Sequence, residues 1–156
     1  MKRANNISVR VFVYPEEDYS KIKETFFQLI GMNEEKLTEE KIEFSDKKAK
    51  GFGEKIIRII SIYFEKDRHC NAFLKRLKEM IPEEEVDFMI NQKNRIDEHL
   101  NYFIRLDKKS LLEEKVELTD SGDCFHIKIN VAAFPRKKEI GYKLITEIFS
   151  KNIDNA

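Results

Sequence analysis

The chain has 156 residues, of which 41% are hydrophobic and 37% charged, and its 29 basic residues balance 29 acidic residues. This length and apolar content predict one globular domain over residues 1–156. A net charge of zero excludes a generally basic protein, so any anion site must be a local patch. Its two cysteines, Cys70 and Cys124, form neither a disulfide framework nor a CxxC zinc motif. With no secretory leader and no apolar run near the ~18 residues of a membrane span, we expect a cytoplasmic protein without membrane contact.

The first predicted element is a strand over residues 7–14, because apolar residues occupy every second position from Ile7 to Val13. Its other face presents Arg10, Phe12 and Tyr14. A proline and three acids follow, which predicts the start of a helix whose apolar stripe ends at Gly31.

The next stretch is more polar. Residues 37–44 predict a weak strand, and residues 45–53 predict a basic, hairpin-like loop containing Lys47, Lys48 and Lys50. The loop lacks the GxxxxGK[ST] pattern of a phosphate-binding loop. Residues 54–65 are rich in isoleucine, which predicts a strand covered on both faces or lying at a subunit contact.

The remaining predicted elements are, in order, a helix over 67–81 with Asp67 as N-cap, a helix over 82–92, a strand over 99–107, a helical turn over 108–114, a strand over 115–118, a tight turn over 119–123, a strand over 124–134 and a helix over 135–152. The long strand over 124–134 suits an interior position in a sheet. Mixed hairpins and helices predict an α+β fold with two layers, a largely antiparallel sheet with helices packed on one face.

Cations and rings recur on the outward faces of three predicted strands. The candidates are Arg10, Phe12, Tyr14, Phe103, Arg105, His126 and Lys128. Bases of single-stranded RNA stack on aromatic rings while Arg and Lys bind phosphate, so this pattern favours RNA as the partner. The lysines of the 45–53 loop would extend the same patch. The alternatives are an ordinary solvated face, or a face buried against a protein or a second copy of this chain.

The last predicted helix opens with Arg136, Lys137 and Lys138, whereas the first predicted helix and the one over 82–92 open with acids. Cations at a helix start cost a few tenths to ~1 kcal/mol unless they are screened. The same helix end presents N–H groups to anions. This segment is therefore a second candidate phosphate contact, and three surface cations without a ligand are the alternative.

Enzymatic motifs are absent from the sequence. The three histidines lack metal-binding spacing, and no GxSxG, GxGxxG or reactive-cysteine pattern occurs. We therefore expect no catalytic residue, metal or cofactor. A nuclease site built from Asp97, Glu98 and Asp107 is the remaining enzymatic alternative, although a polar turn and a strand end explain these residues better.

Four segments, in this order and spacing, resemble a known family: residues 7–15, Gly51-Phe52-Gly53 before 56–62, Asp97 with 102–108, and Gly122-Asp123 with 127–139. They resemble the small archaeal RNA-binding-domain family known as predicted exosome subunits, over residues 7–149. The resemblance implies an α+β fold like that of the ribosomal protein that binds 5S rRNA. It also implies a non-catalytic RNA-binding role, with Arg105, Asp107, Lys108 and Arg136 as the positions to carry over.

We therefore expect an RNA-binding protein acting beside the exosome, RNA processing or ribosome assembly, with proteins of those systems as partners. The alternative is a protein-interaction or homodimer module without RNA affinity.

Overall fold

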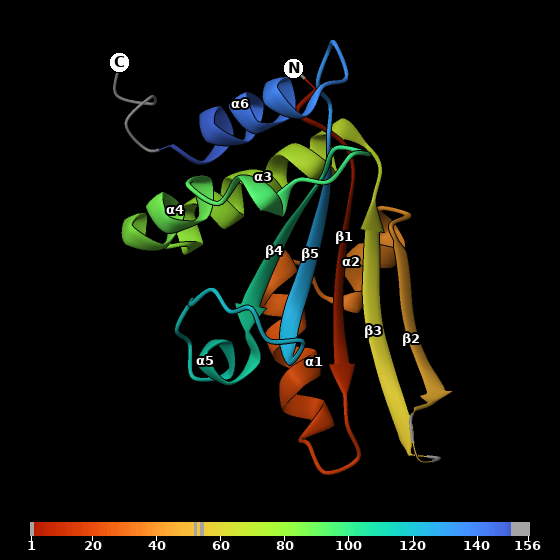
Figure 1. Ribbon diagram of the computed structural model, residues 1–156. Helices are drawn as coiled ribbons and strands as arrows, with labels where there is room; N and C mark the ends of the chain where they lie inside the picture. The colour runs from red at the N-terminus through yellow and green to blue at the C-terminus, as the bar shows by residue number, and fades with distance from the viewer. Residues whose placement is uncertain (1, 52, 54, 151–156) are drawn as a thin grey trace.

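The computed structural model describes residues 2–51, 53 and 55–150, and a five-stranded antiparallel sheet organises it (Figure 1). The strands are β1 (Ala4–Val13), β2 (Glu43–Lys50), β3 (Ile56–Phe64), β4 (Asn101–Asp107) and β5 (Cys124–Val131). The helices are α1 (Tyr19–Ile30), α2 (Glu34–Glu39), α3 (Asp67–Met80), α4 (Glu83–Ile90), α5 (Lys108–Leu112) and α6 (Lys138–Phe149), with a 3-10 turn η2 (Lys93–Arg95). The predicted α+β class is confirmed. None of the described helices combines the length and apolar character that crossing a bilayer requires.

The strand order is β2-β3-β1-β5-β4, so the first strand lies in the middle of the sheet. Val9 of β1 pairs with Ile62 of β3 on one side and with Ile127 of β5 on the other. These three side chains are buried on the helix-covered face, as the period-two pattern predicts. The prediction that the strand beginning at Cys124 is interior is confirmed, because β5 lies between β1 and β4.

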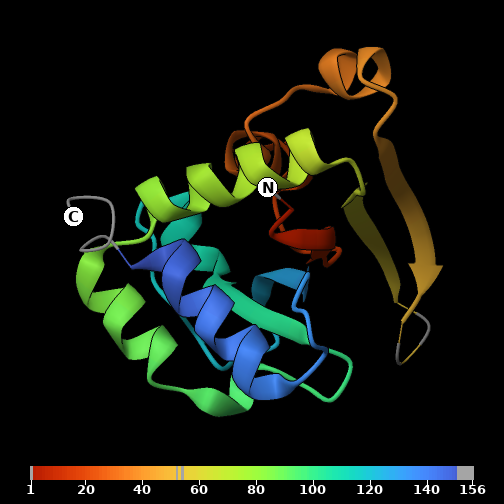
Figure 2. The same cartoon turned by 90° about the horizontal axis from the view of Figure 1, so that it is seen from above.

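The core lies between the sheet and the helices, which Figure 2 shows from above. Phe26 of α1, Phe73 of α3 and Phe149 of α6 are each at most 2% exposed. The helices that carry these rings cover only one face of the sheet. On the other face, the side chains of β1, β5 and β4 are polar or half-buried.

Two predictions for residues 37–53 are wrong in part: the predicted strand begins only at Glu43, and most of the predicted hairpin-like loop is itself a strand, paired antiparallel with β3. Residues 34–39 form helix α2, capped by the Asn33 side chain, which accepts from the Lys36 backbone N–H at 2.8 Å. Residues 43–50 form strand β2 and not a loop, so Lys47, Lys48 and Lys50 lie on an edge strand. The cause is tertiary: β2 pairs with β3 along its whole length, and this pairing overrides a polar sequence with little strand character. Phe52, in the remainder of the predicted loop, lies outside the described residues.

Smaller differences concern the ends of elements. The predicted strand over 115–118 is reduced to a single bridge between Leu106 and Leu118. The N-cap of α3 is Lys66, and Asp67 is the first helical residue. Helix α6 begins at Lys138, later than predicted, after a cis Phe134–Pro135 peptide bond. Residues 54 and 151–152 of the predicted elements lie outside the described part of the chain.

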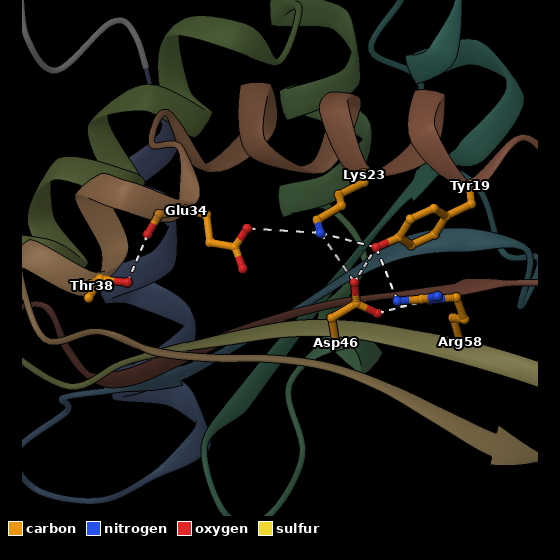
Figure 3. A network of polar contacts seen from close by, with 6 residues as sticks. All are labelled: Tyr19, Lys23, Glu34, Thr38, Asp46 and Arg58. Atoms are coloured by element: carbon orange, nitrogen blue, oxygen red, sulfur yellow. Dashed lines mark hydrogen bonds and ion pairs between the residues drawn. The ribbon is translucent and has the colours of Figure 1, made fainter.

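A polar cluster fixes the β2–β3 arm to the first helix (Figure 3). The Tyr19 hydroxyl donates to the Asp46 carboxylate, and Arg58 Nε donates to the same group at 3.1 Å. Lys23 Nζ lies 3.4 Å from Asp46 and 4.0 Å from Glu34 of α2. Burial acts to raise the pKa of Asp46, but the hydrogen bonds from Tyr19 and Arg58 outweigh it and hold the pKa below its ordinary value. The arm is therefore held by charge-assisted hydrogen bonds.

Candidate nucleic-acid interface

The strand register brings most of the predicted site residues together. Arg10 of β1 pairs with His126 of β5, which pairs with Arg105 of β4. One step along the sheet, Lys128 of β5 pairs with Phe103 of β4. Because paired residues point to the same face, these five side chains belong to one surface built from three strands.

This surface is hollowed into a groove of ≈ 780 Å³. We call it the sheet groove; the residues that line it are Ser8, Val9, Arg10, Glu43, Ser45, Ser61, Ile62, Tyr63, Asp97, Asn101, Phe103, His126 and Lys128. A smaller hollow of ≈ 160 Å³ shares Arg10 and His126 with it and reaches Phe12 and Arg105. The concavity therefore extends across the sheet from β2 to β4.

The cations of the sheet groove, Arg10 and Lys128, and of the smaller hollow beside it, Arg105, surround a neutral imidazole. Burial, followed by the charges of Arg10, Arg105 and Lys128, lowers the pKa of His126 to about 4. Within the described ranges, Arg10 and Lys128 form no ion pair. Arg105 likewise meets no carboxylate there and donates to the backbone oxygen of Asp120 at 3.2 Å. Three positive charges are thus available to an anion at neutral pH.

Aromatic rings lie between these charges. The Phe103 and His126 rings have centroids 5.7 Å apart, tilted by 43°. Arg10 Cζ lies 5.2 Å from the centre of the Phe12 ring. Rings with partly exposed faces beside cations can accept a stacked base while the cations meet its phosphate.

A chain of amides closes one end of the sheet groove. The Asn5 side chain donates to Asn130 at 2.8 Å, Asn130 donates to Asn101 at 2.9 Å, and Asn101 donates to Asp97 at 3.3 Å. Burial acts to raise the pKa of Asp97, but hydrogen bonds from Asn101 and the His99 backbone hold it below its ordinary value. Asp97 is therefore ionised, and its carboxylate accepts hydrogen bonds from Asn101 and from the His99 backbone N–H.

The acids of the nuclease alternative are not brought together. Asp97 is bonded to the first residue of β4, whereas Asp107 ends that strand and caps α5 by accepting from the Ser110 backbone at 3.0 Å. Seven strand residues separate such positions by roughly 20 Å. Among the described residues, no group of three or more His, Cys, Asp or Glu side chains is arranged to hold a metal ion.

Lys108 is the clearest departure from the predicted site. Its side chain is 2% exposed, and Nζ donates to the Phe12 backbone oxygen at 2.8 Å and to Glu17 at 2.9 Å. Nζ also lies 2.8 Å from Asp123 and 5.0 Å from the Tyr14 ring centre. Burial acts to lower the pKa of Lys108, but Asp123 and Glu17 outweigh it and raise it. Lys108 therefore joins β1, α5 and the turn before β5, and its charge does not face RNA.

The other predicted basic residues lie around the sheet groove or away from it. Lys47 pairs with Ile59 and has the parity of Ser45, so it shares the groove face. Lys48 and Lys50 have the parity of Asp46, which contacts α1 on the opposite face. The cations of the last predicted helix start are all exposed, but two of them precede α6: Arg136 and Lys137 lie in the loop before it, and only Lys138 is helical.

Several groove residues were not anticipated from sequence. Ser61 and Tyr63 belong to β3, which the isoleucine-rich pattern predicted to be covered on both faces. Both are instead half-buried on the groove face. Ser61 and Tyr63, at two alternate positions in the aliphatic second half of the strand, were the signal that could have identified this face.

Comparisons with known proteins identify the family of the chain. A family model described as RNA binding matches residues 6–131. An RNA-binding protein of Pyrococcus abyssi is 27% identical over 146 residues, which cover 93% of each chain. A solved DUF54 protein of Methanothermobacter thermautotrophicus is 28% identical, with a TM-score of 0.74 over 96% of this chain and 100% of that one. A DUF54 protein of Archaeoglobus fulgidus is 25% identical, with a TM-score of 0.77 over 94% and 99%. The match spans four fifths of the sequence, and the chain therefore belongs to this RNA-binding family.

Proposed function

We propose that this protein binds RNA, without catalysis, through the sheet groove. The observation that carries the proposal is the group of three cations, Arg10, Arg105 and Lys128, around a neutral His126 on the sheet face that the helices leave open. These cations come from three paired strands of one sheet, so the fold holds the spacing of their backbone positions, and no backbone segment has to be ordered when a phosphate backbone binds.

Single-stranded RNA is the form that fits best. Phe12, Phe103 and His126 are half-buried rings on this face, and unpaired bases can reach them, whereas bases stacked in a duplex cannot. Family membership and the name of the Pyrococcus relative support RNA as the ligand. We also propose that the protein acts beside the exosome, in RNA processing or in ribosome assembly, which rests on the sequence resemblance alone. The proposed location is the cytoplasm, as the sequence predicts.

The test is fluorescence anisotropy with labelled single-stranded RNA, hairpin RNA and duplex DNA over a salt series. We expect single-stranded RNA to bind tightest, with an affinity that falls steeply as salt rises. The groove variant replaces Arg10, Arg105 and Lys128 with glutamine. Each phosphate contact contributes about 0.7 to the salt slope of a single strand, so losing three should flatten the slope by about 2. At 0.1 M salt this corresponds to roughly 100-fold weaker binding.

The matched control removes three exposed cations from the helix layer: Lys21, Lys75 and Lys143, each to glutamine. It changes the net charge equally, so a general charge effect would weaken both variants alike. Unchanged RNA affinity in the groove variant would overturn the proposal.

A protein-interaction or homodimer module is the second candidate, favoured by Ile56, which is 54% exposed at the start of β3. The backbone of β3 is paired on both sides, so only its side chains could meet a partner. Sedimentation velocity separates the candidates: a tight dimer without RNA affinity would favour this one.

A further inference from the structure

The loop between β5 and α6, residues 132–137, exposes an aromatic ring that the fold does not use. Phe134 is 93% exposed, whereas its neighbour Ala133 is 6% exposed. Two hydrogen bonds shape the loop: the Ala132 N–H donates to the Arg3 oxygen at 3.0 Å and ties the loop to the start of the chain, and the Lys137 N–H donates to the Pro135 oxygen at 2.9 Å and closes a turn within the loop. The ring is therefore presented by a hydrogen-bonded loop and stays in solvent, although burying a Phe side chain would be worth about 1.5–3 kcal/mol.

This loop lies at the amide-closed end of the sheet groove. Arg136 Nη2 is 3.5 Å from the His99 backbone oxygen, and the Asn130 side chain donates to the same oxygen at 3.1 Å. The His99 N–H in turn donates to Asp97, which lines the sheet groove. In Figure 2 the blue loop lies beside the green segment that leads into β4. An RNA strand that leaves the sheet groove at Asn130 therefore meets this loop next.

The charges around Phe134 suit a nucleotide. Arg136, Lys137 and Lys138 follow the ring, all are exposed, and none forms an ion pair with another described residue. The other large hydrophobic side chains exposed in the described chain, Ile56 and Phe88, belong to β3 and α4. A single ring among cations offers a base a stacking face and its phosphate a counter-charge, but it offers a protein no broad apolar surface.

We propose that Phe134 stacks on an unpaired RNA base just beyond the sheet groove, while Arg136 and Lys137 hold the adjoining phosphates. The site deepens the proposed function and rests on it, because it extends the same RNA path by about one nucleotide. In this site Phe134 of the loop stacks on a base. The contact should tolerate any RNA sequence, because every base has an aromatic face.

The sequence contains no tryptophan, so one substitution supplies a reporter. Single-stranded RNA at saturation should quench the tryptophan fluorescence of Phe134→Trp. The matched control is Phe88→Trp, which places the reporter at another exposed phenylalanine, on α4, and should not respond. Phe134→Ala should bind single-stranded RNA about 5- to 100-fold more weakly, as expected for one lost stacking contact. Phe134→Tyr should keep the wild-type affinity, and urea unfolding should be the same for all Phe134 variants.

The outcomes distinguish this inference from the proposed function. Full affinity in Phe134→Ala, together with unquenched Phe134→Trp, overturns the stacking site; if the groove variant still loses affinity, the proposed function stands. If the wild-type protein does not bind single-stranded RNA, the proposed function fails and the stacking site fails with it. A dimer of the RNA-free protein that Phe134→Ala dissociates would assign the ring to a protein contact and overturn the inference.

Discussion

His126 should make the protein less stable in acid, and His126→Gln should remove that effect. Burial and the cations Arg10, Arg105 and Lys128 lower the pKa of His126 from 6.5 to about 4. The unfolded chain, with a pKa near 6.5, therefore takes up this proton first as the pH falls. The contribution to stability is complete above pH 6.5 and is lost progressively between about pH 6.5 and pH 4.

The size of the effect follows from the two pKa values. One pKa unit corresponds to 1.36 kcal/mol, so a pKa lowered from 6.5 to about 4 gives about 3 kcal/mol as an upper limit. The sheet groove is open to solvent, which screens the three charges, so we expect about 1–2 kcal/mol. The measurement is urea unfolding at pH 7 and pH 4.5. The wild type should lose about 1–2 kcal/mol more than His126→Gln between the two pH values.

His99→Gln is the control, because His99 is exposed and its side chain lies outside the group of three cations. It should lose as much stability on acidification as the wild type. Equal losses in the wild type and His126→Gln would refute the reasoning, since they would mean that burial and the cations do not lower the pKa of this imidazole. RNA phosphates that neutralise the cations should also raise the pKa of His126, which an NMR titration with and without single-stranded RNA would detect.

Three further predictions concern residues that hold the strands of the sheet groove in place or lie beside it. Lys108→Met should lower the free energy of unfolding by about 2 kcal/mol, measured in urea, because it removes the buried ammonium group that donates to Glu17 and to the Phe12 backbone oxygen; an unchanged midpoint would contradict this stabilising role of Lys108. Asp46→Asn should cost about 1 kcal/mol at pH 7, and the difference from wild type should shrink as the pH falls below 3.8, because the wild-type carboxylate then gains its proton as well. Replacing Arg136, Lys137 and Lys138 with alanine should weaken RNA binding and flatten its salt slope in anisotropy titrations; an affinity equal to wild type would place the phosphates elsewhere.

Periodicity was sufficient for the elements that face the core. The strands beginning at Ala4 and Cys124 have apolar residues at every second position, and the structure pairs them as neighbours. Strand β2 could not be predicted in this way, because its sequence is polar and the strand exists through pairing with β3. Register, which only the folded sheet defines, also decides that Lys47 shares the groove face while Lys48 does not.

Part of the candidate site could be predicted from the sequence, again because of periodicity. Alternation within one strand showed that Arg10, Phe103, Arg105 and Lys128 point away from the core, and pairing across strands then placed them together. Lys108 illustrates what sequence could not show. Its burial depends on Glu17 and Asp123, which are distant in the sequence and meet it only when β1 and β5 are adjacent.

The central position of β1 has a consequence for the order in which the molecule assembles. Val9 pairs with Ile62 and with Ile127, so the middle of the sheet closes only when the last strand has docked. Contacts this distant in sequence are formed late and slow the folding of a domain. During synthesis, the first strand leaves the ribosome long before its second neighbour exists. Arg10 and His126 come from those two strands, so an intermediate that lacks β5 has no sheet groove.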